Sequence, residues 1–414
     1  MATSRLPPLP SSERWHGLDA IRAFALLLGV CLHASMSFLP GAQYFWVAHD
    51  TQPSAALGLL FYVPHMFRMI LFFLLAGFFA RMGLERLGLR RFARDRWWRI
   101  ATPLLAGWPL ASAAIVAVLA WGAMLANGGV MPKQAPPGPA FTPESFPLTH
   151  LWFLYALLLA YLGALLLRAA TALADRQGRV MRTIDRIVRG VMGPWAPLIL
   201  AVPLAISLWL QPQWFMWFGI PTPDQSLYPS FAAVTGFGGA FALGWLLHRQ
   251  TDLLQVWSRH WPLMTMLAIA CTMACLTIVG LAPKLAPATH DTRTLLYVAC
   301  YSVAAWSWTL ALVGIALRFL SAHSPVRRYV ADASYWMYLI HLPLVMALQV
   351  AVARLDWPAS LKFAVILISV FAVMLTSYHW LVRNTWLGAW LNGRRKAGGP
   401  TVPEARATSV VPAM

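Results

Sequence analysis

Long apolar stretches, separated by short polar connections, constrain this chain more than any other feature of its sequence. A helix needs about 20 mostly apolar residues to cross a bilayer. Ten stretches meet or approach that requirement, the fifth and sixth being the shortest: residues 20–39, 56–80, 100–126, 148–167, 194–210, 231–247, 262–282, 294–317, 333–353 and 360–382. The pattern predicts an all-α, polytopic integral membrane protein with about ten transmembrane helices.

The charge composition agrees with this class and argues against a nucleic-acid partner. Only 11% of the residues are charged and 59% are hydrophobic, whereas soluble domains carry about 25% charged residues. Lys and Arg outnumber Asp and Glu by 32 to 14, a balance that can indicate binding to nucleic acid. Here the basic residues form short clusters between apolar stretches. Membrane topology explains such clusters better, so we expect the lipid bilayer as the partner.

The distribution of the basic residues predicts the orientation in the membrane. With the N-terminus in the cytoplasm, two of the 32 Lys and Arg residues, Arg22 and Arg68, lie inside apolar stretches, and 25 fall on the cytoplasmic side. The external connections hold only five, namely Lys133, Lys284, Arg293, Arg354 and Lys362. An excess of positive charge is typical of the cytoplasmic face. We therefore expect both the N- and C-termini in the cytoplasm.

The chain divides into three segments. Residues 1–19 are polar and Pro-rich, and are expected to be a cytoplasmic N-terminal segment, not a cleaved secretory signal. Residues 20–392 are expected to form the membrane domain, and 393–414 a disordered cytoplasmic tail. The external connection 127–147 is rich in Pro and Gly and is expected to be irregular. The four cysteines fall in apolar stretches without CxxC or HExxH motifs, so we expect neither a disulfide framework nor a metal site.

Polar groups inside the apolar stretches are the candidates for chemistry, because they are costly in a bilayer and usually face a protein interior or a water-filled cavity. Arg22 and His33 are eleven residues apart, which places them on one helix face about 16 Å apart along the axis. Asp19 lies at the cytoplasmic start of this helix, and Gly29 lies on the same face between Arg22 and His33. One interpretation is a groove from Arg22 to His33. The alternative is that Arg22 reaches the headgroups and His33 is a hydrogen-bonded core residue.

The second and ninth stretches also carry polar residues on one face. His65 and Arg68 are three residues apart, and Arg68 lies near mid-membrane, where reaching the headgroups is difficult. Acidic residues are nearly absent from the stretches, so a functional role for Arg68 is favoured over a structural ion pair. Ser334, Tyr338 and His341 form a polar stripe on the ninth stretch. Interhelical hydrogen bonding is the alternative to function here, and the favoured interpretation for Ser334.

Two further features lie at the ends of stretches. His150 and Trp152 begin the fourth stretch, where an interfacial aromatic belt explains Trp152. Seven arginines occur within residues 81–99, more than orientation alone requires. Of these, Arg96 and Arg99 are one helical turn apart beside the third stretch and have the chemistry to bind a polyanion such as a nucleotide phosphate. A solvated cytoplasmic loop is the alternative.

The residues, taken together, resemble the membrane acyltransferase family 3. PHMFRMILFFLLAGFF at 64–79 is especially similar to the glucan succinyltransferase branch of that family. The segments that carry the resemblance keep one order along nearly the whole hydrophobic chain: LDAIRAFALLLGVCLH at 18–33, FFLLAGFFA at 72–80, RWWRIATPL at 96–104, HLWFLYALL at 150–158 and SYWMYLIHLPL at 334–344.

The resemblance implies an O-acyltransferase of the bacterial inner membrane. Its donor would be cytoplasmic acyl-CoA, either succinyl-CoA or acetyl-CoA, with no bound cofactor. Its acceptor would be a hydroxyl of an extracytoplasmic carbohydrate such as periplasmic glucan, with proteins of glucan synthesis as candidate partners. In the family the histidine of the R-x10-H element is catalytic, which here is His33. Its arginine is Arg22, and the RxxR element matches Arg96 and Arg99; these arginines are linked to donor binding or active-site integrity.

Several alternatives stay open at the level of sequence. His33 acts either as a general base or through a transient acyl-histidine, and His65 is the second candidate for the catalytic role. Arg68 either stabilises an oxyanion or pairs with a succinyl carboxylate, and Tyr338 and His341 are candidate supporting residues. The rival functions are an acetyltransferase for lipid-linked sugars or surface polysaccharide, and a transporter or flippase.

Overall fold

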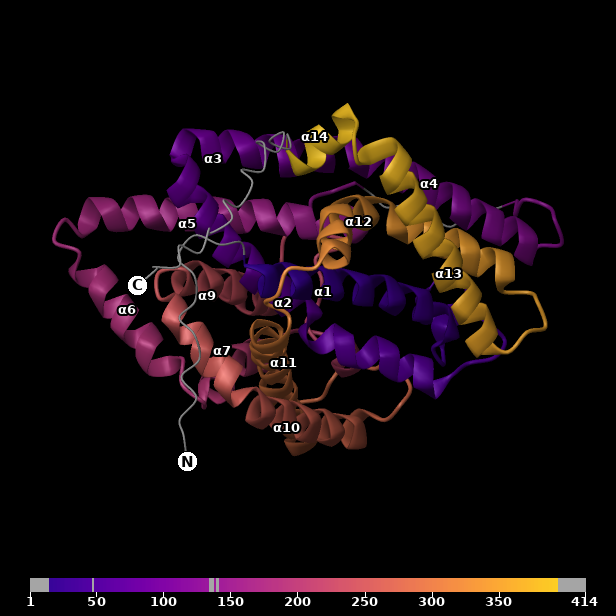
Figure 1. Ribbon diagram of the computed structural model, residues 1–414. Helices are drawn as coiled ribbons and strands as arrows, with labels where there is room; N and C mark the ends of the chain where they lie inside the picture. Colours follow the sequence, from indigo (N-terminus) through magenta and orange to yellow (C-terminus); the bar gives the residue numbers. More distant parts are fainter. Residues whose placement is uncertain (1–14, 47, 134–137, 139–140, 394–414) are drawn as a thin grey trace, which may run out of the picture.

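The computed structural model describes residues 15–46, 48–133, 138 and 141–393, and the regular elements within those ranges are all helices (Figure 1). The expected all-α class is therefore confirmed for this part of the chain. The first helix begins at His16, somewhat before the predicted start. The predicted N-terminal segment up to residue 14 and the predicted disordered tail from residue 394 lie outside the described residues.

Eight helical segments in the described ranges are long and apolar enough to cross a membrane. Each matches one of the predicted stretches, although α2 extends well beyond its predicted cytoplasmic end. In the third of these segments, the α-helices α3 (Leu89–Arg96) and α4 (Thr102–Ala126) are joined without a break by a π-helical turn. The other seven are α1 (His16–Ser35), α2 (Ala55–Leu87), α5 (Trp152–Ala174), α10 (Leu254–Val279), α11 (Thr292–Phe319), α12 (Pro325–Val352) and α13 (Ala359–Ser377).

The fifth and sixth predicted stretches form shorter helices, as their lengths suggested. The fifth is α7 (Ala196–Trp209), and the sixth is the continuous run from α8 (Phe231–Ala233) through a π-helical turn to α9 (Gly239–Leu247). α7 follows α6 (Arg179–Val191), an amphipathic helix that the sequence analysis did not anticipate, at a bend of 109°. The short helix α14 (Trp386–Asn392) ends the described chain.

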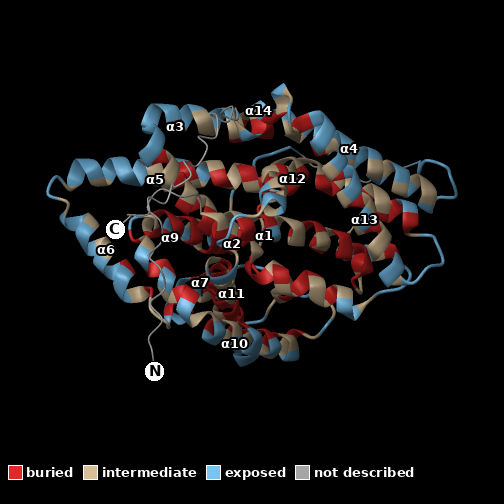
Figure 2. Ribbon diagram, in the orientation of Figure 1, coloured by how far each residue is buried: buried red, intermediate tan, exposed pale blue. Residues whose placement is uncertain are grey.

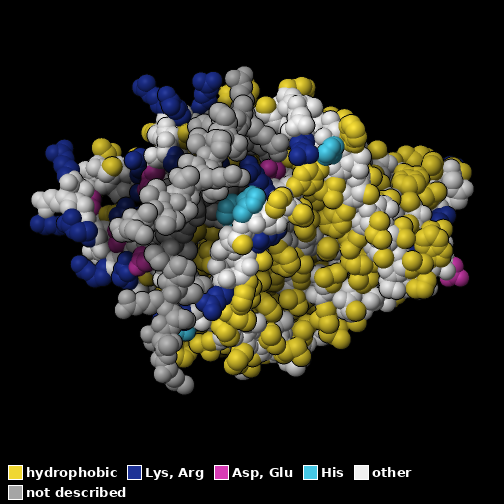
Figure 3. Space-filling view, in the orientation of Figure 1, with side chains coloured by type: hydrophobic (Ala, Val, Ile, Leu, Met, Phe, Trp, Pro, Cys, Tyr) yellow, Lys and Arg dark blue, Asp and Glu magenta, His cyan; other side chains and the backbone are white. Residues whose placement is uncertain are grey.

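The connections between helices fall into two groups at opposite ends of the molecule, and one group is basic. Arg249, between α9 and α10, pairs with Asp185 of α6 at 2.6 Å. His248 of the same connection lies 3.4 Å from Glu85 near the end of α2. Figure 3 shows Lys and Arg side chains gathered at the end that carries α3 and α6, beside a broad apolar surface.

The second group of connections lies at the other end of the helices. The Leu227 amide, in the connection after α7, donates to the Pro143 carbonyl in the connection after α4, at 2.8 Å. The Ala288 amide, between α10 and α11, donates to the Trp214 carbonyl at 2.7 Å. α7 and the α8–α9 run each begin in one group and end in the other. Both therefore pass between the two ends of the molecule despite their short length.

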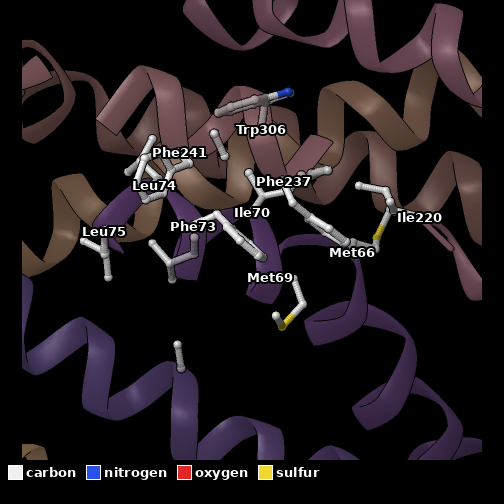
Figure 4. Packing of buried hydrophobic residues seen from close by; sticks show 14 of the residues in the cluster. Met66, Met69, Ile70, Phe73, Leu74, Leu75, Ile220, Phe237, Phe241 and Trp306 are labelled. Carbon is white, nitrogen blue, oxygen red and sulfur yellow. The ribbon is translucent and has the colours of Figure 1, made fainter. Parts of the chain in front are cut away.

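α2 lies at the centre of the bundle and positions the polar residues of the second stretch. About half of its residues are buried (Figure 2). Phe73 of α2 stacks on Phe237 of the π-helical turn before α9, with ring centroids 5.3 Å apart (Figure 4). At Gly77 of α2 and Gly244 of α9, a Cβ atom would overlap the backbone of the opposite helix. Such close approach at small residues is typical of membrane helix pairs.

Candidate active site

α1 and α2 bring their polar residues together at a glycine. Gly29 of α1 faces Arg68 of α2, and a Cβ atom at Gly29 would overlap the Arg68 guanidinium. The space beside Gly29 is therefore filled by this side chain, and the groove expected along α1 is closed at that point. Gly29 and His33 are one turn apart on the same face of α1, so the guanidinium lies about 6 Å along the helix axis from the position of His33.

His33 lies in the last turn of α1 and is not sealed in the core. The residue as a whole is neither fully buried nor exposed. Its buried Nδ1 atom has no hydrogen-bond partner among the described residues. A hydrogen-bonded core histidine would be expected to use this buried nitrogen in a bond.

Arg68 lies near the middle of α2 without an acidic partner. Its Nε atom is buried and unbonded, and no carboxylate of the described residues pairs with its guanidinium. His65, one turn earlier on α2, stacks its ring on Phe61 with centroids 5.0 Å apart. An unpaired cation at this depth is costly, which marks a functional position more often than a structural one.

His341 and Tyr338 of α12 join the site together with His150, which the sequence analysis placed only at the start of the fourth stretch. The His341 ring centroid lies 5.2 Å from that of His33 and 5.2 Å from that of His150. The Tyr338 hydroxyl donates to the His150 carbonyl at 2.8 Å, and His150 Nε2 donates to the Leu339 carbonyl at 3.1 Å. These bonds hold the start of α5 against α12. Within the described ranges, no group of three His, Cys, Asp or Glu side chains is arranged to hold a metal ion.

Trp46 and Gln349, both absent from the predicted site, lie on another side of His33. The Trp46 ring is inclined by 19° to the His33 ring, with centroids 6.3 Å apart. Its indole N–H donates to Oε1 of Gln349 at 2.8 Å. Nε2 of Gln349 in turn donates to the carbonyls of His33 at 2.9 Å and Ala34 at 3.1 Å. The Gln349 amide therefore links the connection after α1 to the end of α1 itself.

The connection that carries Trp46 is anchored by a buried ion pair. Nζ of Lys362 lies 2.7 Å from Oδ2 of Asp50, and the two side chains are 0% and 2% exposed. Nζ also donates to the Ala353 carbonyl at 3.3 Å. Lys362 was expected in an external connection, whereas the structure places it inside a helix. Lys362 lies in the first turn of α13 and faces the protein interior, where a carboxylate compensates its charge.

The residues predicted at the start of α1 lie at the basic end of the molecule, away from this cluster. Arg22 pairs with Asp19 at 3.2 Å, and its guanidinium lies over the Phe79 ring, 5.6 Å from the centroid. The Arg22 side chain is about a third exposed, at 36%. It is therefore accessible to a ligand that approaches from this end.

Arg96 and Arg99 converge on one acidic residue. Arg96 pairs with Asp95 at 2.5 Å and Arg99 pairs with the same carboxylate at 2.9 Å. The Arg96 guanidinium also lies over the rings of Phe92 and Tyr161. These contacts give both arginines a structural partner, and Arg99 is the more exposed of the two, with 37% against 25% of its side-chain surface accessible.

The position of Trp152 differs from the interfacial one expected from the sequence. It is only 8% exposed and packs on Phe237, 5.5 Å between ring centroids. It therefore belongs to the core and not to an interfacial aromatic belt. The neighbouring His150 is buried for the same reason, because the start of α5 is enclosed between α2 and α12.

Comparison with known proteins identifies the family whose sequences match this chain. The acyltransferase 3 family model, described as an acyltransferase domain, matches residues 15–379. The glucans biosynthesis protein C of Shigella boydii serotype 4 is 34% identical over 103 residues, and that of Shigella dysenteriae serotype 1 is 35% identical over 103 residues. Each match covers 25% of this chain and 26% of the relative's length. No solved structure matches the chain.

The matched region includes every helix that contributes to the cluster. It contains the Arg22 and His33 positions of α1, Arg68 of α2 and His341 of α12. The family match thus extends over most of the chain and over the whole candidate site. This chain belongs to the acyltransferase 3 family.

Proposed function

We propose that this protein is a membrane O-acyltransferase that moves an acyl group from cytoplasmic acyl-CoA to a hydroxyl of a carbohydrate on the opposite side of the membrane. The observation that carries the proposal is the arrangement of His33 and Arg68. The ring of His33 has an unbonded nitrogen and the residue is not fully buried, and a guanidinium that pairs with no carboxylate of the described residues lies one helical turn away. This pair offers a base for a hydroxyl proton and a cation for developing negative charge.

The proposed reaction is a direct transfer. Neutral His33 takes the proton of the acceptor hydroxyl as its oxygen bonds to the thioester carbonyl carbon. Negative charge develops on the carbonyl oxygen, and Arg68 stabilises it. The carbon–sulfur bond then breaks, and the leaving thiolate takes the proton back from His33, so that the products are an ester and free CoA. His341 and Tyr338 support the site by packing against His33 and by holding the start of α5.

The donor enters from the basic end in this scheme. Arg22 and Arg99 are each about a third exposed there, and their guanidinium groups suit phosphate oxygens. Asp19 pairs with Arg22 and lines a small pocket with Arg327 and Arg328. Arg96, which is packed between aromatic rings, holds the join between α3 and α4 in place. The axial distance along α1 from Arg22 to His33 is about 16 Å, and the pantetheine arm passes beside the Arg68 guanidinium, which fills the α1 face at Gly29.

The unpaired guanidinium also bears on the choice of acyl group. A guanidinium has five N–H donors, so with a succinyl donor Arg68 can serve the thioester carbonyl oxygen and the succinyl carboxylate together, whereas an acetyl group offers only the carbonyl oxygen. The relatives named glucans biosynthesis protein C support a glucan as the acceptor. We therefore propose succinyl transfer to a glucan of the bacterial periplasm, with the protein in the inner membrane.

A transfer assay with purified protein tests this function. Wild-type protein in detergent is expected to release CoA from succinyl-CoA only when a glucan oligosaccharide is present, and mass spectrometry is expected to find the succinyl ester on the sugar. Acetyl-CoA, supplied in competition, is expected to be the poorer donor. Transport of labelled glucan across the membrane of proteoliposomes, without release of CoA, would instead indicate that the protein is a transporter.

We also propose that the basic group of connections, and both termini with it, lie in the cytoplasm. The charge bias supports this orientation, and the two groups of connections at opposite ends of the helices agree with it. The external side then carries Trp46 and the connections after α4 and α7. This places the carbohydrate acceptor on the same side as Trp46.

Thiol labelling is expected to give opposite results at two exposed positions. Val130 lies in the connection after α4 and is 65% exposed, and Leu89 begins α3 and is 51% exposed. In a background without the four native cysteines, Val130→Cys is expected to react with a membrane-impermeant maleimide in intact spheroplasts. Leu89→Cys is expected to react only after lysis. Labelling of Leu89→Cys in intact cells would invert the topology.

A further inference from the structure

We propose that Trp46 is an acceptor-binding residue, a flat wall on which a sugar ring packs, and that Gln349 is the positioning residue that holds this wall at His33. This inference rests on the proposed function and extends it to the acceptor. It assigns two residues that no sequence motif marked.

The position of Trp46 is fixed with respect to the base. Its ring is nearly parallel to the His33 ring, and it keeps partial exposure, so its surface is not wholly covered by protein. The indole N–H is bonded to Gln349, which orients the ring. The aliphatic face of a sugar ring packs favourably on a flat aromatic face, since apolar surface is buried without loss of the sugar's hydroxyl hydrogen bonds at the rim.

The side-chain amide of Gln349 makes hydrogen bonds both to Trp46 and to the end of α1. Its carbonyl oxygen accepts from Trp46, while its NH₂ group donates to the backbone carbonyls of His33 and Ala34. The side chain is 1% exposed, so loss of any of these bonds would leave a buried polar group unsatisfied. A single amide therefore sets the distance between the aromatic wall and the helix end that carries the base.

The backbone behind Trp46 is also fixed. Asp50 is held by Lys362, and its amide donates to the Ser37 carbonyl at 2.9 Å. The Ser54 amide donates to the Phe38 carbonyl at 2.8 Å. These bonds fold the connection back onto the end of α1. A surface set so firmly beside a base suits an acceptor that must present one hydroxyl in a defined direction.

The test separates acceptor binding from donor binding. A neutral linear β-glucan oligosaccharide is titrated into Trp46→Leu, Trp46→Phe and Gln349→Leu by calorimetry, and the KM values for glucan and for succinyl-CoA are measured in parallel. Trp46→Leu is expected to weaken glucan affinity about tenfold, with less than about a twofold change in donor KM. Trp46→Phe, which keeps a flat face, is expected to lose less affinity than Trp46→Leu. Gln349→Leu is expected to resemble Trp46→Leu.

Trp336→Leu is the matched control, because the Trp336 indole also donates a side-chain hydrogen bond, to Ser377 at 3.0 Å, but lies between α12 and α13 away from His33. It is expected to change neither KM. Unchanged glucan affinity in Trp46→Leu, or equal rises in both KM values, would overturn the inference. Calorimetry measures glucan binding without turnover. If glucan bound through Trp46 but the protein transferred no acyl group, the proposed function would be wrong and the role of Trp46 would still hold.

Discussion

Replacing His33 with glutamine is expected to lower the rate of acyl transfer by about 10²- to 10⁴-fold, the usual contribution of a general base. Glutamine keeps much of the size and hydrogen bonding of histidine but cannot accept a proton at neutral pH. The His33 backbone carbonyl, which accepts from Gln349, is unaffected by the change. We therefore expect the variant to fold and to bind succinyl-CoA as the wild type does. The measurement is succinyl transfer to glucan together with donor affinity.

His260→Gln provides the matched control for this experiment. The His260 Nδ1 atom bonds to the Val256 carbonyl at 2.9 Å within α10, outside the candidate site. Its replacement is expected to leave transfer unchanged. Transfer by His33→Gln within about threefold of wild type, with the control also active, would remove His33 from the role of base and favour His65.

Replacing Lys362 with methionine is expected to destabilise the protein by about 3–5 kcal/mol, because the Asp50 carboxylate would remain buried without a cation beside it. The pair has 0% and 2% exposed side chains, so solvent cannot take over the role of the lysine. The free energy of unfolding is measured in detergent with increasing denaturant. The glucan affinity should fall too, because the connection that carries Trp46 loses its anchor.

The double variant Lys362→Met with Asp50→Leu separates charge from packing. Removal of both charges leaves no uncompensated ion, and apolar replacements of buried pairs are often near neutral. The double variant is therefore expected to recover most of the lost stability. If the single variant were as stable as the wild type, the ion pair would not anchor the connection.

Much of the site could be predicted because its residues break a strong pattern. Arg68 and His33 interrupt apolar helices, where polar groups are rare and costly, and this made them visible in the sequence. The helical period then placed Gly29 on the face of His33. The all-α class followed from the apolar stretches, and eight of the ten predicted spans correspond to helices long enough to cross a membrane in the described part of the chain.

The remaining residues depend on tertiary contacts that no local pattern encodes. Gln349 is one polar residue on a helix that already carries several, and Trp46 lies between two predicted stretches. Their hydrogen bond joins positions 303 residues apart. The burial of Lys362 could not be predicted, because a charge near a helix end looks solvated until its partner Asp50 is known. α6 was missed because its arginines were interpreted as part of a cytoplasmic loop.

The contact between Gly29 and Arg68 has a consequence for how this sequence can change. Any side chain at position 29 would occupy the place of the guanidinium, so a larger residue 29 requires that Arg68 move away or be shortened. In either case the buried cation is lost from its place beside His33. Gly29 of α1 thus leaves the space that Arg68 of α2 needs. Substitutions at positions 29 and 68 are therefore expected to occur together in relatives that transfer a different acyl group.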